Sequence, residues 1–204
     1  MPSSRNGNEN ATGNANGNGN GNAKSAPAGP HAYFGHVQST SVLRLTGPIR
    51  FVAAQALRRF VDELIEGVED GGVLIDLRAV ELIDSTGMGL LARIGRNSLQ
   101  RLGRRAVIAC PENDVATCLR SVAFDELFVM MDSYPFDDDA TLAEVALAGE
   151  CGTAAATEGG LGRVILDAHR ELASVSERNL AAYRDVIAAL EADLRATQHP
   201  PSQS

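Results

Sequence analysis

The sequence is short of the residues on which many binding and catalytic sites depend. Tryptophan is absent and only 4% of the 204 residues are aromatic, so few side chains could stack on bases or sugars. The 18 lysines and arginines are outnumbered by 26 aspartates and glutamates, which gives a net charge of −8. Nucleic acid is therefore disfavoured as the main partner, because phosphate contacts need clustered basic side chains.

Long hydrophobic runs are also missing. No stretch approaches the roughly 18 consecutive apolar residues of a membrane span, and the N-terminus lacks the apolar core of a signal peptide. The three cysteines, Cys110, Cys118 and Cys151, are odd in number and lie at spacings that suit no metal-ligand set. We therefore expect a cytoplasmic protein with free thiols, no membrane contact, no metal and no cofactor.

The sequence contains no complete catalytic set. It has no Walker-type phosphate loop, and the Gly-Met-Gly run at 87–89 is only a fragment of a glycine fingerprint. The three aspartates at 137–139 lack the spaced ligands of a calcium loop. Asp76 falls in an expected buried strand and Asp84 in an expected helix cap, so they do not make a catalytic pair. No nucleophile elbow surrounds Ser85. We therefore expect no enzymatic activity.

The composition divides the chain into four parts. Residues 1–31 form an Asn/Gly-rich tract with almost no apolar content, which we expect to be disordered. Residues 32–148 alternate between strand and helix patterns, and residues 149–162 form a linker of small residues. From 163 to 198, apolar residues recur every three or four positions, which predicts one amphipathic helix of about nine turns. Such a helix must cover its own domain, a second copy or a partner groove, and self-association is favoured.

Residues 32–148 predict a single small α/β domain with a mixed β-sheet and packed helices. Val73–Leu77 and Ala106–Cys110 are short and apolar, as expected for central strands that are buried on both faces. The helical pattern between them makes a βαβ unit, which requires parallel strands. Ser41–Thr46 alternates apolar and polar residues, which predicts a half-buried strand that ends in a turn at 47–48.

Weaker patterns complete this domain. Residues 111–122 predict a helix with Cys118 on its inner face, and residues 127–130 predict a last short strand. Thr141 and Glu144 have the spacing of a capping box, which predicts the start of another helix.

The most informative segment is Asp84-Ser85-Thr86-Gly87, where the chain leaves a buried strand and enters a helix. Such a junction leaves backbone N–H groups unpaired and carries the positive end of the helix dipole. A hydroxyl at this position can cap the helix, or it can accept a phosphate that the helix end stabilises. The residues alone leave both interpretations open.

Four segments together carry a resemblance to a known family. They are Leu45-Thr46-Gly47, Val73-Leu74-Ile75-Asp76-Leu77, Ile83-Asp84-Ser85-Thr86-Gly87-Met88-Gly89-Leu90-Leu91 and Ser121-Val122-Ala123-Phe124-Asp125. Over roughly residues 36 to 148, the chain resembles the STAS-domain family, and within it the bacterial anti-sigma factor antagonists.

In the resembling proteins, the serine directly after the aspartate is phosphorylated by a partner that is both anti-sigma factor and kinase. A metal-dependent serine phosphatase removes the phosphate. The resemblance implies that Ser85 is the phosphate acceptor, that Thr86 is a weaker candidate, and that the unphosphorylated form binds the anti-sigma factor. The implied partner-binding residues are Thr46, Gly47, Arg50, Asp84, Ser85, Thr86, Gly87 and Met88. The alternative is a non-switching STAS scaffold whose C-terminal helix oligomerises or docks a signalling partner.

Overall fold

The computed structural model describes residues 29–67, 71–134, 142–145 and 158–198. The strands are β1 His31–Val37, β2 Thr40–Ile49, β3 Val73–Ile83, β4 Ala106–Ala109, β5 Phe128–Met131 and β6 Ala143–Val145. The helices are α1 Phe51–Gly67, α2 Ser85–Leu102, α3 Asp114–Ser121, α4 Phe124–Leu127, α5 Glu158–Ala173 and α6 Glu177–Gln198. All but the last three residues of the Asn/Gly-rich tract lie outside the described residues, as do the acidic run at 137–139 and Cys151.

The described strands form one mixed sheet in the order β5-β4-β3-β2-β1-β6. Strands β2 to β5 pair in parallel, whereas β1 pairs antiparallel with β2 and with β6. Helix α2 connects the parallel neighbours β3 and β4, so the predicted βαβ unit is confirmed. The expected α/β class with a mixed sheet is confirmed as well.

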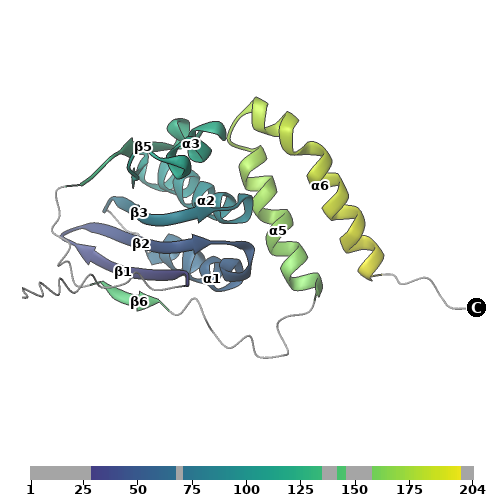
Figure 1. The fold of residues 1–204 in the computed structure, drawn as a ribbon, viewed down its shortest axis with the longest axis horizontal. Helices are drawn as coiled ribbons and strands as arrows, with labels where there is room; N and C mark the ends of the chain where they lie inside the picture. Colours follow the sequence, from purple (N-terminus) through teal and green to yellow (C-terminus); the bar gives the residue numbers. More distant parts are fainter. Residues whose placement is uncertain (1–28, 68–70, 135–141, 146–157, 199–204) are drawn as a thin grey trace, which may run out of the picture.

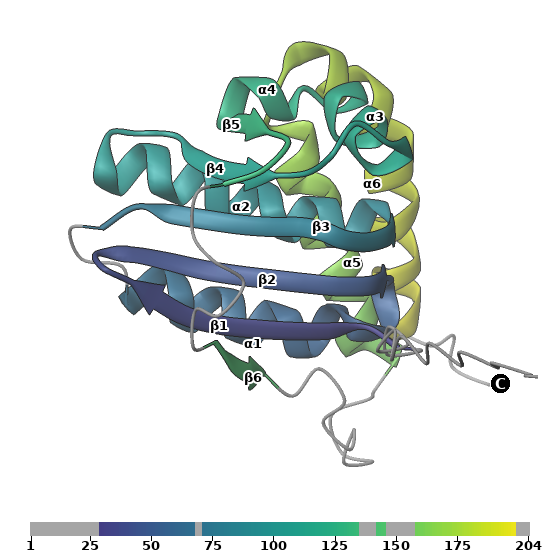
Figure 2. The ribbon, with the colours of Figure 1, turned by 60° about the vertical axis from the view of Figure 1, so that its left-hand side comes forward.

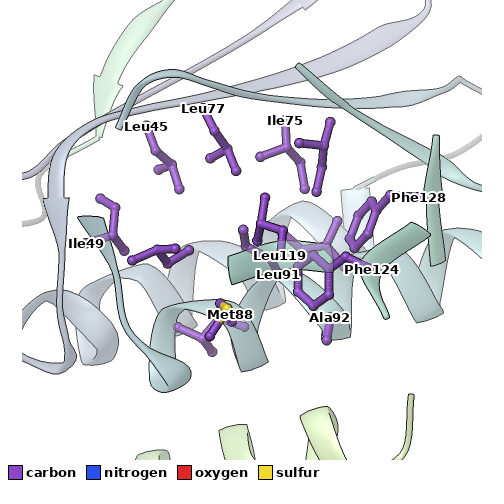
Figure 3. Close-up of a cluster of buried hydrophobic side chains, with 14 of the residues drawn as sticks. Leu45, Ile49, Ile75, Leu77, Met88, Leu91, Ala92, Leu119, Phe124 and Phe128 are labelled. Carbon is purple, nitrogen blue, oxygen red and sulfur yellow. The ribbon is translucent and has the colours of Figure 1, made fainter. Parts of the chain in front are cut away.

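The helices lie in layers on one face of the sheet. Helices α1 and α2 cover that face, α5 packs outside them, and α6 lies outermost (Figures 1 and 2). The core fills the space between the sheet and α2, where Leu45 and Leu77 point toward Met88 and Leu91 (Figure 3). Burying each such side chain stabilises the fold by about 1.5–3 kcal/mol.

Strand β2 continues to Ile49, so the turn predicted at 47–48 is wrong. Gly47 adopts a φ of 70°, and the register between β2 and β3 shifts between Gly47 and Pro48. A glycine in this conformation makes the strand irregular without ending it. A Cβ atom at Gly47 would lie 2.5 Å from the carbonyl oxygen of Gly29, so this position also lacks space for a side chain.

The predicted inward position of Cys118 is wrong. The thiol is exposed, because α3 turns Val115, Ala116 and Leu119 toward the core. Successive helical residues are rotated by about 100°, so a face centred on those three residues leaves Cys118 outside.

Glu144 lies in a strand, and the capping box predicted from it is wrong. Strand β6 pairs with β1, and the Glu144 carboxylate lies 2.7 Å from Nδ1 of His31. Pairing with a strand that is distant in sequence thus decides the local structure. Because β6 follows β5 in the chain, β5 is not the last strand in chain order, contrary to the prediction.

The C-terminal segment forms two helices, so the prediction of one continuous helix is wrong. Helix α5 begins at Glu158, inside the segment expected to be a linker, and α6 begins at Glu177. The hydroxyl of Ser176 accepts a hydrogen bond from the backbone N–H of Asn179 over 3.2 Å. Ser176 therefore caps the start of α6 and separates the two helices. We call α5 and α6 together the C-terminal hairpin.

The C-terminal hairpin packs on its own domain. The side-chain amide of Asn179 is only 2% exposed and donates to the carbonyl oxygens of Val122 over 2.9 Å and Leu172 over 3.1 Å. Arg96 of α2 pairs with Glu171 of α5. The sequence left three surfaces open for the C-terminal segment to pack on: its own domain, a second copy or a partner. The structure shows that it packs on its own domain. Self-association remains a prediction.

Helix α5 crosses α2 at a glycine. A Cβ atom at Gly89 would overlap the backbone of Ala168, so the two helices approach too closely for any side chain at this point. Gly89 lies four residues after Ser85, or about 6 Å along the helix axis. The hairpin therefore contacts α2 about one helical turn after Ser85.

The opposite face of the sheet carries a buried charged network. The carboxylate of Asp76 accepts hydrogen bonds from Arg44 Nε over 2.8 Å, Arg78 Nε over 3.0 Å and the Tyr134 hydroxyl over 2.8 Å. Burial alone would raise the pKa of Asp76, but the hydrogen bonds from Arg78, Tyr134 and Arg44 outweigh it and hold the pKa below its ordinary value.

We expect Gly89→Ala to lower the free energy of unfolding by about 1–3 kcal/mol, because the added methyl group must push α5 away from α2. Urea unfolding followed by circular dichroism measures this. The control is Gly162→Ala in α5, where the nearest atom is the flexible end of Leu194 at 3.1 Å. The control should change stability by less than about 1 kcal/mol. Equal effects of the two substitutions would contradict the close crossing.

We expect Asp76 to contribute stability that is lost in acid. Its folded-state pKa lies below the ordinary value of 3.8, so the contribution is complete above that value and disappears as the pH falls through the folded-state pKa. Urea unfolding between about pH 6 and pH 2 should give a flatter profile for Asp76→Asn than for the wild type. The exposed Asp185→Asn variant of α6 should keep the wild-type profile.

Candidate functional site

Asp84 joins the starts of the two helices that follow the central strands. As the N-cap of α2, its Oδ1 accepts a hydrogen bond from the N–H of Gly87 over 2.9 Å. Its Oδ2 accepts from the N–H of Phe51, the first residue of α1, over 2.6 Å. Its own N–H donates to the carbonyl oxygen of Ile49 over 3.1 Å. One residue therefore satisfies an unpaired N–H in each helix and ties the ends of β2 and β3 together.

Ser85 is the first residue of α2 and is partly exposed. Because Asp84 supplies the cap, α2 does not need the hydroxyl of Ser85 for this purpose. The start of α1 is held at the same carboxylate, so the positive ends of two helices lie beside Ser85.

Three of the sequence-predicted site residues in α2 are buried. Thr86 is 3% exposed, Met88 is 8% exposed, and Gly87 is buried as well. A Cβ atom at Gly87 would lie 3.0 Å from Cγ1 of Ile83 and 3.1 Å from Cγ2 of Ile49. The missing side chain of Gly87 therefore serves close packing within the domain.

The predicted site residues on β2 are divided between core and surface. Gly47 is buried, and the Oγ1 atom of Thr46 is buried without a hydrogen-bond partner among the described residues. Arg50 is exposed and stands directly before α1. The structure thus leaves Arg50, Ser85 and part of Asp84 accessible at the end of the sheet.

Two exposed apolar residues lie beside Ser85 that the sequence pattern did not predict as site residues. Phe51 is 44% exposed and Leu82 is 41% exposed. Phe51 is hydrogen-bonded to Asp84, and Leu82 lies three residues before Ser85 at the end of β3. We call Arg50, Phe51 and Leu82 together the switch rim.

A bulge in β3 explains why Leu82 faces outward. Val80 pairs with Gly47 and Leu82 pairs with Pro48, so Glu81 is an extra residue on β3. In a regular strand, side chains alternate between the two faces, so Leu82 would lie on the same buried face as Val80. The extra residue shifts the alternation by one position and turns Leu82 outward. The only sequence signal was the Gly-Pro pair on the neighbouring strand.

Within the described parts of the chain, no group of three or more His, Cys, Asp or Glu side chains could hold a metal ion. No helix among the described residues combines the length and apolar character needed to cross a lipid bilayer.

Residues 35–139 match the family model of the STAS domain, which confirms the resemblance found in the sequence. No curated protein matches the chain.

Three solved structures are similar to parts of this chain. An anti-sigma factor antagonist from Mycobacterium paratuberculosis is 22% identical, with a TM-score of 0.45, over 53% of this chain and 91% of its own. The anti-sigma factor antagonist SpoIIAA in its unphosphorylated form is 21% identical, with a TM-score of 0.41, over 51% of this chain and 89% of its own. The Bacillus cell fate determinant SpoIIAA in its phosphorylated form is 18% identical, with a TM-score of 0.40, over 50% of this chain and 90% of its own.

We expect Asp84→Ala to lower the free energy of unfolding by about 1–3 kcal/mol, because the N–H groups of Gly87 and Phe51 both lose their acceptor. The matched control is Asn113→Ala, which removes the cap of α3, where Asn113 accepts from the N–H of Ala116 over 3.0 Å. Urea unfolding should show the larger loss for Asp84→Ala. A loss no greater than that of Asn113→Ala would contradict the double role of Asp84.

Proposed function

The chain belongs to the STAS domain family, and from this premise we propose that it is an anti-sigma factor antagonist controlled by phosphorylation of Ser85. The unphosphorylated form binds an anti-sigma factor that is also a serine kinase, and thereby releases a sigma factor. The kinase ends this binding by phosphorylating Ser85, and a metal-dependent serine phosphatase restores it. We propose that the chain has no enzymatic activity of its own and acts in the cytoplasm.

The position of Ser85 carries this proposal. Its hydroxyl stands at the first residue of α2, partly exposed, beside a cap that Asp84 already provides. A kinase can therefore reach the hydroxyl without breaking a bond that holds the helix start. Thr86 is 3% exposed, so its phosphorylation would require the first turn of α2 to open. This favours Ser85 over Thr86 as the acceptor.

The surroundings of Ser85 suit a reversible phosphate. Phosphorylation adds about −1.5 to −2 charges, which the positive ends of helices tolerate well. Asp84 holds two such ends in place at this point, those of α1 and α2. The modification can therefore change the surface while the domain remains folded.

The switch rim supplies the contact that the phosphate interrupts. Phe51 and Leu82 offer exposed apolar surface, and Arg50 adds a positive charge beside them. Such a rim fits a partner that presents an apolar pocket flanked by acidic groups. A phosphate on Ser85 places negative charge next to Asp84 and repels that acidic surface. Loss of one tight contact patch changes the fraction of this protein that is bound to its partner by orders of magnitude.

The C-terminal hairpin limits where this partner can dock. Helix α5 packs on α2 at Gly89 and at Arg96, so this part of the outer face of α2 is already occupied. The partner then approaches from the end of the sheet, over the switch rim. We accordingly propose that residues 32–148 and the hairpin act as one unit, with the N-terminal tract outside it.

The alternative, a non-switching scaffold that assembles through its C-terminal helix, has less support. Of the apolar side chains predicted to drive assembly, Leu172 is buried against the same chain, whereas Leu180 of α6 is 57% exposed. A second copy or another partner would have to use the outer face of α6.

We expect Ser85→Ala to bind the kinase partner as the unphosphorylated wild type does, and Ser85→Asp to bind at least about tenfold more weakly. Incubation with the kinase and ATP should phosphorylate the wild type, and mass spectrometry should locate the phosphate on Ser85. The matched control is Ser121→Asp on the exposed side of α3, which adds the same charge away from the switch rim.

The control should bind like the wild type and still accept phosphate at Ser85. Equal binding by Ser85→Ala and Ser85→Asp would rule out the switch. Phosphorylation of Ser85→Ala at the wild-type level would rule out Ser85 as the acceptor.

A further inference from the structure

A cavity lies on the face of the sheet that α1 and α2 leave uncovered, at the amino-terminal ends of β2, β3 and β4. Its volume is about 420 Å³, within the range of roughly 300–1,000 Å³ that small-molecule sites occupy. We call it the open-face cavity. The described residues that define it are Thr40, Leu74, Arg105, Val107, Met131 and Tyr134. Ser85 lies at the opposite, carboxyl end of the strands, so the cavity is separate from the switch rim.

The floor of the open-face cavity is apolar. Leu74 and Val107 are register partners on the neighbouring strands β3 and β4, so their side chains lie next to each other on this face. Met131 of β5 extends the floor and is exposed. Leu74 is buried, so Val107 and Met131 provide the accessible part of this floor. An apolar floor in a hollow is typical of a ligand site.

The ring of Tyr134 forms a fixed wall. Its hydroxyl donates to Asp76 over 2.8 Å and accepts from Arg44 over 2.8 Å and Arg78 over 2.9 Å. The guanidinium of Arg78 also stands 4.4 Å from the centre of the ring. A ring held in this way cannot turn into the hollow and fill it. The cavity is therefore formed before any ligand arrives, which lowers the cost of binding.

The mouth of the cavity is polar and positively charged. Arg104 and Arg105 come from the segment before β4, Ser39 comes from the turn before β2, and Thr40 is the first residue of β2. Arg105 donates to the carbonyl oxygen of Asp125 over 2.9 Å, a neutral acceptor that orients the guanidinium and does not cancel its charge.

We propose that the open-face cavity binds a flat apolar molecule that carries one carboxylate. The carboxylate pairs with Arg105 at the mouth, because a guanidinium matches the geometry of a carboxylate with two parallel hydrogen bonds. The apolar part lies on Leu74 and Val107, against the ring of Tyr134 and the sulfur of Met131. An aromatic group suits both of these last contacts.

Titration of the full chain with 2-naphthoate, followed by isothermal calorimetry, tests the proposal. We expect saturable binding at one site per chain. The neutral analogue 2-naphthamide has the same rings and nearly the same size, and we expect it to bind about tenfold more weakly. Absence of saturable binding of 2-naphthoate would overturn the proposal, and equal affinity for the two probes would overturn the role of Arg105.

Variants locate the site. Arg105→Gln should weaken 2-naphthoate binding about tenfold and leave 2-naphthamide binding unchanged. Val107→Phe should abolish the binding of both probes, because the larger side chain fills the floor. Arg163→Gln on the exposed side of α5 removes the same charge elsewhere and should change nothing.

Circular dichroism and urea unfolding of each variant establish that it is folded. If Val107→Phe does not fold, the comparison of Arg105→Gln with its control Arg163→Gln still tests the proposal. Wild-type binding by Arg105→Gln, or by a folded Val107→Phe, would show that the probe binds elsewhere and would overturn the proposal.

Discussion

The two carboxylate oxygens of Asp84 are the constraint on which the rest of this domain depends. One oxygen holds the start of α2 and the other holds the start of α1, while the backbone N–H binds the end of β2. Two parallel strands and the two helices that follow them therefore meet at one residue. The exposure of Ser85, the orientation of Phe51 and the nearness of two positive helix ends all follow from this arrangement.

The sequence allowed prediction of those elements whose causes are local. The apolar run that starts at Val73, the helical pattern that ends before Gly103 and the acidic residue at Asp84 each predict their own structure, and the structure agrees. Contacts between distant segments decided the remainder. Glu144 became part of a strand because β1 lies beside it. The C-terminal segment divides at the local cap of Ser176, and the bond from Asn179 to the carbonyl oxygen of Val122 then holds the hairpin on its own domain.

The candidate site was predictable to the same extent. Asp84 and Ser85 are adjacent in the sequence and define a helix start, so their positions followed from the chain alone. Phe51 and Leu82 reach the site from two different strand ends. Their exposure depends on a bulge opposite Gly47 and on a hydrogen bond to Asp84. Neither contact has a pattern that is visible along a single stretch of sequence.

The crossing of Gly89 by Ala168 has a consequence for the order in which the molecule is made. The ribosome synthesises α2 well before α5, so a nascent chain leaves the outer face of α2 bare until α5 emerges. Glycine at this position leaves a shallow notch in that face, without a protruding side chain. A late-arriving helix can settle into such a notch without displacing anything already packed. Helix α5 therefore covers α2 only after all six described strands have been synthesised.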